Sequence, residues 1–232
     1  MTQHITSSPV FGLLLCVGAY SIALYIRHKT KSLFANPFVV ATILIVIFLS
    51  ITGIDYNDFK VGSSFINMFL SPVIVVLAVP LYRQRHLLNR YSMAIFISIA
   101  VGVIAALVSI LAISRLCGME EIIEKSMISK SITAPIGIEI THMIGGIEGI
   151  TVLSILSSGL IGAICAPAIF KVLGIKHSVA KGIGIGVASH AIGTSKALEM
   201  GEDIGAISSL SIGMSGIATV VMVSLLDIFL WN

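Results

Sequence analysis

The chain has 232 residues, of which 56% are hydrophobic and 11% charged, and its formal net charge is +3. Soluble domains carry about 25% charged residues, so this composition and a mean hydropathy of +1.06 exclude an ordinary soluble domain and predict an integral membrane protein. The sequence contains no basic stretch with interleaved aromatic residues, so we do not expect a nucleic-acid partner. The three cysteines, Cys16, Cys117 and Cys165, show no paired spacing, and we expect neither disulfides nor a metal or other cofactor.

Six charge-free apolar segments are long enough, at about 20 residues per helix, to cross a membrane. They lie near residues 5–26, 36–54, 61–82, 91–114, 149–170 and 204–226. The glycine-rich stretch 179–199 is a seventh candidate, and the segment 126–147, which contains Lys130 and Pro135, is an eighth. We therefore expect an all-α fold with about seven or eight transmembrane segments, in which residues 1–232 form a single polytopic membrane domain.

Three basic clusters predict the orientation, because cytoplasmic loops are enriched in Lys and Arg. They are Arg27/Lys29/Lys31, Arg83/Arg85/Arg90 and Lys171/Lys176/Lys181. With all three inside, the N-terminus lies outside and the C-terminus in the cytoplasm. The segment 126–147 then enters and leaves on the same side as a re-entrant or broken hairpin, which Pro135, Gly145 and Gly146 permit. If that segment spanned the membrane fully, a basic loop would be misplaced.

Two segments of opposite predicted direction, 61–82 and 179–199, are each interrupted by polar residues and followed by a long apolar span. This order is typical of inverted-topology transporters. It predicts repeat halves at 36–117 and 126–230, preceded by an extra helix at 5–27. The alternative is that any two helical hairpins of a membrane protein look alike at this level. The interrupting residues are Asn67, Ser71 and Pro72 in the first segment, and Ser189, His190, Gly193 and Thr194 in the second.

Polar residues in the stretch 182–199 stand where a lipid-facing helix would carry Leu or Val. Their cost is tolerable only if they face other protein or a water-filled cavity, so we expect this stretch to form the wall of a solute site inside the membrane. Its candidate binding residues are Ser189, His190, Gly193, Thr194 and Lys196.

Each of these candidates has two interpretations. Lys196 either attracts a substrate carboxylate or pairs with Glu199 or Glu202 nearby. His190 either donates to an anion or carries a proton, or it is a structural histidine bonded to a neighbouring helix. The glycines either interrupt the helix and free N–H groups that attract anions, or permit close helix packing.

A second group of candidates precedes and includes Pro135, which cannot donate to the helical hydrogen-bond ladder. A helix broken there would expose backbone groups to a cavity. The hydroxyl groups of Ser131 and Thr133 would lie beside them. We therefore expect these two residues to contribute to substrate binding.

The other candidates carry weaker signals. Glu139 and His142, three residues apart, either bind a coupling proton or cation or form a surface pair. Asn67 and Ser71, followed by Pro72, are of a kind that more often indicates helix packing than binding. Only the proposed repeat supports a binding role for them. No catalytic triad or phosphate loop is present, so we do not expect an enzyme.

Several stretches together resemble the LrgB/CidB family of bacterial membrane proteins, to which the C-terminal half of the plastid glycolate/glycerate transporter is related. The run Ser-His-Ala-Ile-Gly-Thr that starts at Ser189, followed by a basic residue, is specific, whereas the apolar spans are not. One departure is Glu148, where the family usually has proline. The resembling stretches are Asn36-Pro37, Leu70–Tyr82, Lys130–Ile136, Gly145–Ile147, Ala188–Glu199 and Gly205–Ser209.

The resemblance implies a multi-pass protein of the bacterial plasma membrane. Members are described as holin-like or antiholin-like proteins that affect murein hydrolase export and lysis, or as carriers of small carboxylates. Both descriptions involve a small LrgA/CidA-type membrane partner.

Two functional hypotheses follow. The first is a carrier for small monocarboxylates of the pyruvate, glycolate and glycerate class, with proton coupling, the small partner and a homodimer as its scaffold. On this hypothesis, replacing Lys196 with Met abolishes uptake in proteoliposomes. The alternative is a holin-like or antiholin-like regulator of murein hydrolase export and cell lysis.

Overall fold

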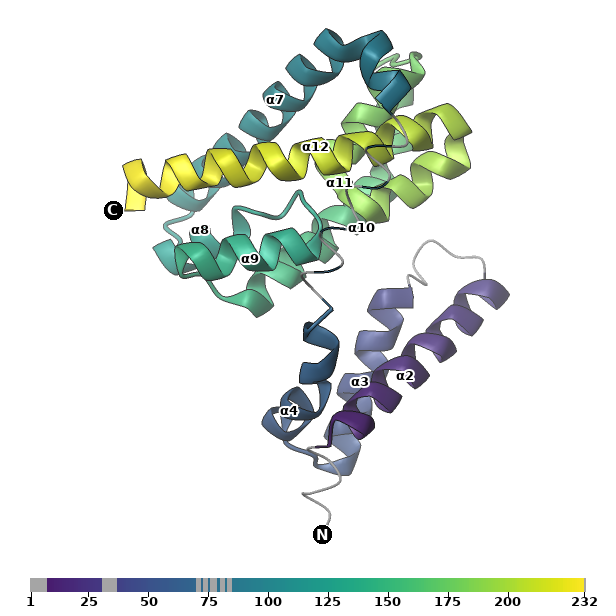
Figure 1. The fold of residues 1–232 in the computed structure, drawn as a ribbon, viewed down its shortest axis with the longest axis vertical. Helices are drawn as coiled ribbons and strands as arrows, with labels where there is room; N and C mark the ends of the chain where they lie inside the picture. Colours follow the sequence, from purple (N-terminus) through teal and green to yellow (C-terminus); the bar gives the residue numbers. More distant parts are fainter. Residues whose placement is uncertain are drawn as a thin grey trace. The chain divides into compact units, whose positions relative to one another are not determined.

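The computed structural model describes residues 8–30, 37–69 and 85–231 and the single positions 72, 75, 79 and 82. Every regular element in these ranges is a helix (Figure 1), as the composition predicts. The contacts divide the chain into two compact units, Met1–Val73 and Ile74–Asn232. This boundary lies inside the first predicted repeat half, 36–117, and the two halves stay a prediction.

The described part of the first unit contains three helices: α2 (Pro9–Thr30), α3 (Pro37–Thr52) and α4 (Tyr56–Asn67). Helices α2 and α3 pack through three buried alanines, Ala19, Ala23 and Ala41, whose small side chains let the two backbones approach. Asp55 caps the start of α4, because its Oδ1 accepts the Asn57 N–H at 2.7 Å.

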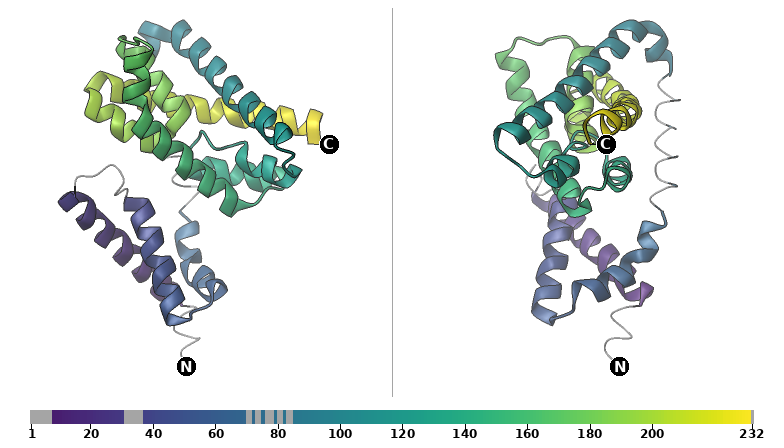
Figure 2. Two further views of the ribbon diagram at one scale, coloured as in Figure 1. Left: turned by 180° about the vertical axis from the view of Figure 1, so that it is seen from behind. Right: turned by 90° about the vertical axis from the view of Figure 1, so that its left-hand side faces the viewer.

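The second unit is built on the hairpin of α11 (Ser178–Met200) and α12 (Glu202–Leu226), which lie side by side (Figure 2). Helix α10 (Glu148–Val172) packs along α11, and α7 (Arg85–Leu116) crosses α11 and α12. Two short helices, α8 (Glu121–Met127) and α9 (Ala134–Ile144), contact α10. A π-helical turn, η1 (Asp227–Trp231), ends the described chain.

The core of this unit is a stripe of α7 side chains three or four residues apart, which places them on one helical face. These residues pack against α11 and α12, and Val187 of α11 fills the space left by Gly102: a Cβ at Gly102 would lie 2.9 Å from its Cγ1. The stripe consists of Ile95, Ile99, Val103, Leu107 and Ile110.

Four helices in the described ranges are long and apolar enough to cross a membrane: Val10–Thr30, Ser92–Leu116, Glu148–Val172 and Glu202–Trp231. They match the predicted spans 5–26, 91–114, 149–170 and 204–226. Val39–Thr52 is apolar but shorter, and the predicted span 61–82 lies partly outside the described residues. The count of about seven or eight spans and the repeat therefore stay predictions.

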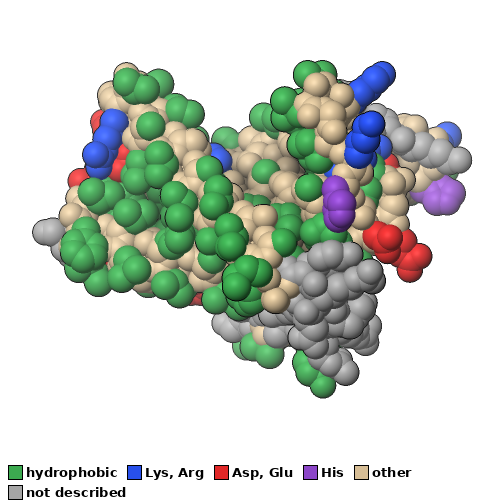
Figure 3. Space-filling model, turned by 90° about the horizontal axis from the view of Figure 1, so that it is seen from above, with side chains coloured by type: hydrophobic (Ala, Val, Ile, Leu, Met, Phe, Trp, Pro, Cys, Tyr) green, Lys and Arg blue, Asp and Glu red, His purple; other side chains and the backbone are tan. Residues whose placement is uncertain are grey.

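Large hydrophobic side chains cover much of the face shown in Figure 3, and many such residues of these helices are exposed. Val101 and Ile161, for example, are 60% and 62% exposed. A surface of this kind is expected of helices that face lipid rather than water. The chain is therefore a membrane protein.

The segment 126–147 is not one helix. Helix α8 ends at Met127, and α9 has only 11 residues, which is about 17 Å and shorter than the hydrocarbon core of about 30 Å. Pro135 stands in the first turn of α9, and Gly145, with φ of 74°, terminates it. The segment therefore consists of the last residues of α8, a connection and the short helix α9.

Candidate functional site

A hollow of about 590 Å³ lies in the second unit, where α10, the α8–α9 connection and α11 meet. It brings together two stretches far apart in the sequence, around Ser131 and around Ser189, both proposed as binding residues. Serines of α10 complete the polar part of its wall. The lining residues are Met127, Lys130, Ser131, Ile150, Leu153, Ser154, Ser157, Ser158, Ile161, Gly162, Ala188 and Ser189.

Helix α11 is broken at His190, beside the hollow. The backbone there has φ of 39° and ψ of −141°, a conformation that L residues rarely adopt and that costs about 1–3 kcal/mol. The His190 Nε2–H donates to the Ile155 carbonyl oxygen of α10 at 2.9 Å. Thr194 Oγ1 donates to the His190 carbonyl oxygen at 2.9 Å and lies 2.6 Å from Ser208 Oγ of α12. These hydrogen bonds stabilise the break by joining α11 to α10 and to α12.

Two glycines of α10 make room for the break. A Cβ at Gly159 would lie 2.8 Å from His190 Cε1, and a Cβ at Gly162 would overlap Ser189 Oγ. On the α11 side, a Cβ at Gly193 would overlap Ser189 Cβ. The break therefore depends on small residues in both helices.

Other glycines of α11 serve packing. A Cβ at Gly182 would lie 2.8 Å from the Ile204 carbonyl oxygen, and one at Gly186 would lie 2.5 Å from the Ser208 carbonyl oxygen. The backbones of α11 and α12 therefore touch at these positions, as small residues four apart allow.

Lys196 does not line the hollow. Its Nζ lies 2.8 Å from Glu199 Oε2, and the glutamate side chain is half exposed. Of the two interpretations of Lys196, the structure therefore displays the ion pair. A role in binding a substrate stays a prediction.

Lys130 is the cation at the wall of the hollow, and it was not among the binding residues proposed from the sequence. Its Nζ donates to Ser131 Oγ at 3.3 Å. Among the residues that the structure describes, no carboxylate pairs with it. The signal in the sequence is a lysine inside an apolar segment, because such residues usually face other protein or a cavity.

Thr133 precedes α9 as its N-cap residue, but its hydroxyl group does not cap the helix. The residue is 6% exposed, and its Oγ1 has no hydrogen-bond partner in the described part of the chain. Thr133 does not line the hollow, although Ser131, two residues earlier, does.

A chain of hydroxyl groups, not foreseen from the sequence, joins α8, α9 and α10. Ser126 Oγ accepts the Ile147 N–H at 2.7 Å, and Thr151 Oγ1 donates to the Ser126 carbonyl oxygen at 2.8 Å. Thr141 Oγ1 of α9 lies 2.7 Å from Thr151 Oγ1. All three hydroxyl-bearing residues are fully buried, so they fix α8 and α9 to the start of α10.

His142 pairs with Glu148, at 3.5 Å between Nε2 and Oε2, and not with Glu139 as expected. The left-handed turn at Gly145 reverses the chain, which brings the first residue of α10 back to the last turn of α9. Glu139 and His142 are both exposed, and the surface pair that His142 forms is with Glu148. A coupling role for Glu139 and His142 stays a prediction.

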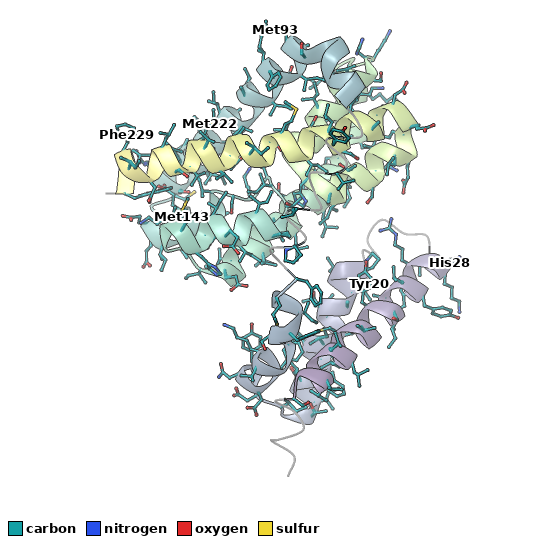
Figure 4. The ribbon with its side chains drawn as sticks, in the orientation of Figure 1. Tyr20, His28, Met93, Met143, Met222 and Phe229 are labelled. Atoms are coloured by element: carbon teal, nitrogen blue, oxygen red, sulfur yellow. The ribbon has the colours of Figure 1, made fainter. Side chains whose placement is uncertain are left out.

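A second contact, at the C-terminus, was also not predicted. Trp231 Nε1–H donates to Oε1 of the buried Glu124 at 3.2 Å, and Lys125 Nζ lies 5.5 Å from the centre of the Trp231 ring. Met143 of α9 lies below α12 (Figure 4), with its sulfur 4.0 Å from Ser224 Oγ. The end of the chain is thus tied to α8 and α9.

The remaining candidates lie in the first unit. Asn67 ends α4, and its side chain is not described. Ser71 lies outside the described residues, and Pro72 is helical and exposed. Within the described ranges, no three His, Cys, Asp or Glu residues come together as metal ligands would.

Comparison with known proteins identifies the family. The model of the LrgB-like family matches residues 16–228. The holin-like protein CidB of Staphylococcus epidermidis is 34% identical over 217 residues, which is 94% of this chain and 95% of the relative. The holin-like protein CidB of Staphylococcus aureus is 36% identical over 92% of this chain and 93% of its own length. The antiholin-like protein LrgB of Bacillus subtilis is 32% identical over 94% and 95%. No solved structure matches the chain. The chain belongs to the LrgB-like family, as the resemblance predicted.

Proposed function

We propose that this protein is a holin-like or antiholin-like regulator of membrane permeability, through which it controls murein hydrolase export and cell lysis. The observation that carries the proposal is similarity over more than nine tenths of the chain to relatives with these names. This was the alternative hypothesis from the sequence, and the comparisons favour it over the carrier hypothesis.

The structure is consistent with this proposal at one point. A regulator of permeability needs polar surface inside a unit whose outside is apolar, and such groups in a membrane usually have a function. The hollow supplies the ammonium group of Lys130 and the hydroxyl groups of Ser131 and Ser189 beside a broken helix.

Controlled expression in a bacterium that lacks its own family members tests the proposal. Entry of a membrane-impermeant dye, hydrolase activity in the medium and lysis are followed over time. We expect the protein to change all three, an increase indicating a holin-like and a decrease an antiholin-like action. Unchanged dye entry, hydrolase export and lysis in cells with the protein in the membrane would contradict the proposal.

A second candidate function is a carrier of small monocarboxylates of the pyruvate, glycolate and glycerate class. The observation that favours it is Lys130, a cation at the wall of the hollow without a carboxylate partner among the described residues. On this proposal the carrier has about seven or eight spans with inverted repeats, a cytoplasmic C-terminus and an external N-terminus. It couples transport to protons, forms a homodimer and works with a small LrgA/CidA-like partner.

Uptake of labelled pyruvate and glycolate by proteoliposomes tests the carrier. The measurement is made with and without a pH gradient, and with and without the small partner. Uptake that depends on the protein supports this candidate. No uptake under any of the four conditions would dismiss it and leave the regulator proposal standing.

A further inference from the structure

The wall of the hollow is more apolar than a small hydrophilic solute requires. Helix α10 contributes Ile150, Leu153 and Ile161 to it. Leu153 and Ile161 are 64% and 62% exposed, so each presents a large apolar surface. Exposed apolar surface of this extent stabilises bound apolar groups.

The serines of α10 do not offer their protons to a ligand. Ser154 Oγ donates to the Thr151 carbonyl oxygen and Ser157 Oγ to the Leu153 carbonyl oxygen, both at 2.8 Å. Ser158 Oγ donates to the Ala188 carbonyl oxygen at 3.1 Å. Each hydroxyl group has one proton, so these serines contribute space rather than donors for an anion.

Lys130 is different, because an ammonium group has three donors and Ser131 Oγ accepts only one of them. The hydroxyl chain through Ser126 and Thr151 holds the end of α8 at the start of α10, and Lys130, three residues after α8, lines the hollow together with Ile150 of α10. Since α10 is a candidate span, its start is the end of a membrane crossing, where lipid headgroups lie. The cation therefore lies toward one end of an apolar groove.

The dimensions of the groove agree with one lipid chain. Its wall follows α10 from Ile150 to Gly162, which is twelve steps of about 1.5 Å, or about 18 Å. The acyl chains of one leaflet span half of a hydrocarbon core of about 30 Å, or about 15 Å.

We propose that the hollow binds one anionic phospholipid, with an acyl chain along α10 and the phosphate group paired with Lys130. A cation at the level of the headgroups attracts an anionic lipid, as basic pockets on the cytoplasmic side of membrane proteins do. The lipid site does not depend on the regulator or the carrier function, because it follows from the charge, apolar wall and length of the hollow alone.

Native mass spectrometry of the purified full chain tests the site, with phosphatidylglycerol and phosphatidylcholine as probes. We expect one phosphatidylglycerol per chain to be retained in preference to phosphatidylcholine. Lys130→Gln should weaken retention about fivefold, the effect of one lysine near an anionic surface, and Lys130→Arg should restore it. The matched control is Lys196→Gln, because Lys196 is paired with Glu199 and does not line the hollow.

A second variant tests the acyl chain and not the charge. Ser157 is exposed at the wall of the hollow, so Ser157→Leu should fill the groove and lower lipid retention while the melting temperature is unchanged.

Equal retention of both lipids, or retention that neither Lys130→Gln nor Ser157→Leu lowers, would overturn the proposal. Binding of pyruvate or inorganic phosphate that requires Lys130, without lipid retention, would overturn it in favour of a free anion. If the protein retains the lipid but has no effect on dye entry, hydrolase export or lysis, only the proposed function is contradicted.

Discussion

The two breaks that meet at the hollow differ in how their polar groups are satisfied. At His190 the backbone is strained, but the ring and the carbonyl group are both hydrogen-bonded. Before α9, Thr133 has ordinary extended angles, φ of −69° and ψ of 145°, yet its hydroxyl group has no partner among the described residues. The first break is therefore held in place by contacts, whereas the connection before α9 leaves a buried hydroxyl group without a partner among the described residues. A conspicuous polar motif in a membrane helix can thus be structural, while unpaired polar groups lie in a plainer segment.

The largest effect is expected from closing the space at the first break. Gly162→Ala places a Cβ on Ser189 Oγ and should lower the free energy of unfolding by about 3 kcal/mol. Thermal unfolding of the purified protein measures it. Gly149→Ala, in the same helix with nothing within 4 Å of its Cβ, is the control. Equal stability of the two variants would mean that α10 and α11 do not touch there.

Substitution of His190 separates strain from hydrogen bonding. His190→Ala leaves the Ile155 carbonyl oxygen without its donor and should cost about 2 kcal/mol. His190→Gly loses the same bond but tolerates the positive φ, so it should cost about 1 kcal/mol less than the alanine variant. Unfolding curves of both variants provide the measurement. If the glycine variant is the less stable of the two, the backbone at residue 190 is not strained.

A pair of lysine substitutions compares the second break with α11 in the functional assays. Lys130→Met should change dye entry or carboxylate uptake about tenfold, or about 1.4 kcal/mol, because it removes the cation that the described residues contribute to the hollow wall. Lys196→Met removes a partly exposed ion pair with Glu199, which is worth at most about 1 kcal/mol, and should have little effect. The sequence alone predicted the large effect at Lys196, and the reverse outcome would restore that prediction.

The smallest effect is expected at the C-terminus. Trp231→Phe removes the indole donor to the buried Glu124 and should lower stability by about 1 kcal/mol. Phe229→Ala is the control, since Phe229 is 80% exposed in the same turn (Figure 4). Trp231 is the single tryptophan, so its fluorescence reports the contact directly, and an emission maximum that Glu124→Leu leaves unchanged would argue against it.

The sequence was sufficient for the features that depend on local composition. The helical class, the family and four of the membrane spans follow from apolar runs and short motifs. Pro135 and Gly145 lie at the two ends of α9 because the conformational limits of proline and the freedom of glycine act locally.

The site was harder to predict from the sequence, because its properties depend on contacts between residues that are distant in the sequence. Whether Lys196 or Lys130 is free to bind a ligand is decided by which lysine has a glutamate within reach, and Glu199 is only three residues from Lys196. The break in α11 occurs at a histidine and not at one of the neighbouring glycines, because the ring finds an acceptor at Ile155, 35 residues earlier. No local pattern contains that information.

The hydroxyl chain through Ser126, Thr141 and Thr151 has a mechanical consequence. These buried bonds join α8 and α9 to the beginning of α10, so the three helices form one unit. Lys130 lies in the connection between α8 and α9. Displacement of α8 or α9 alone relative to α10 would break these buried bonds. The three helices are therefore expected to move together as one body.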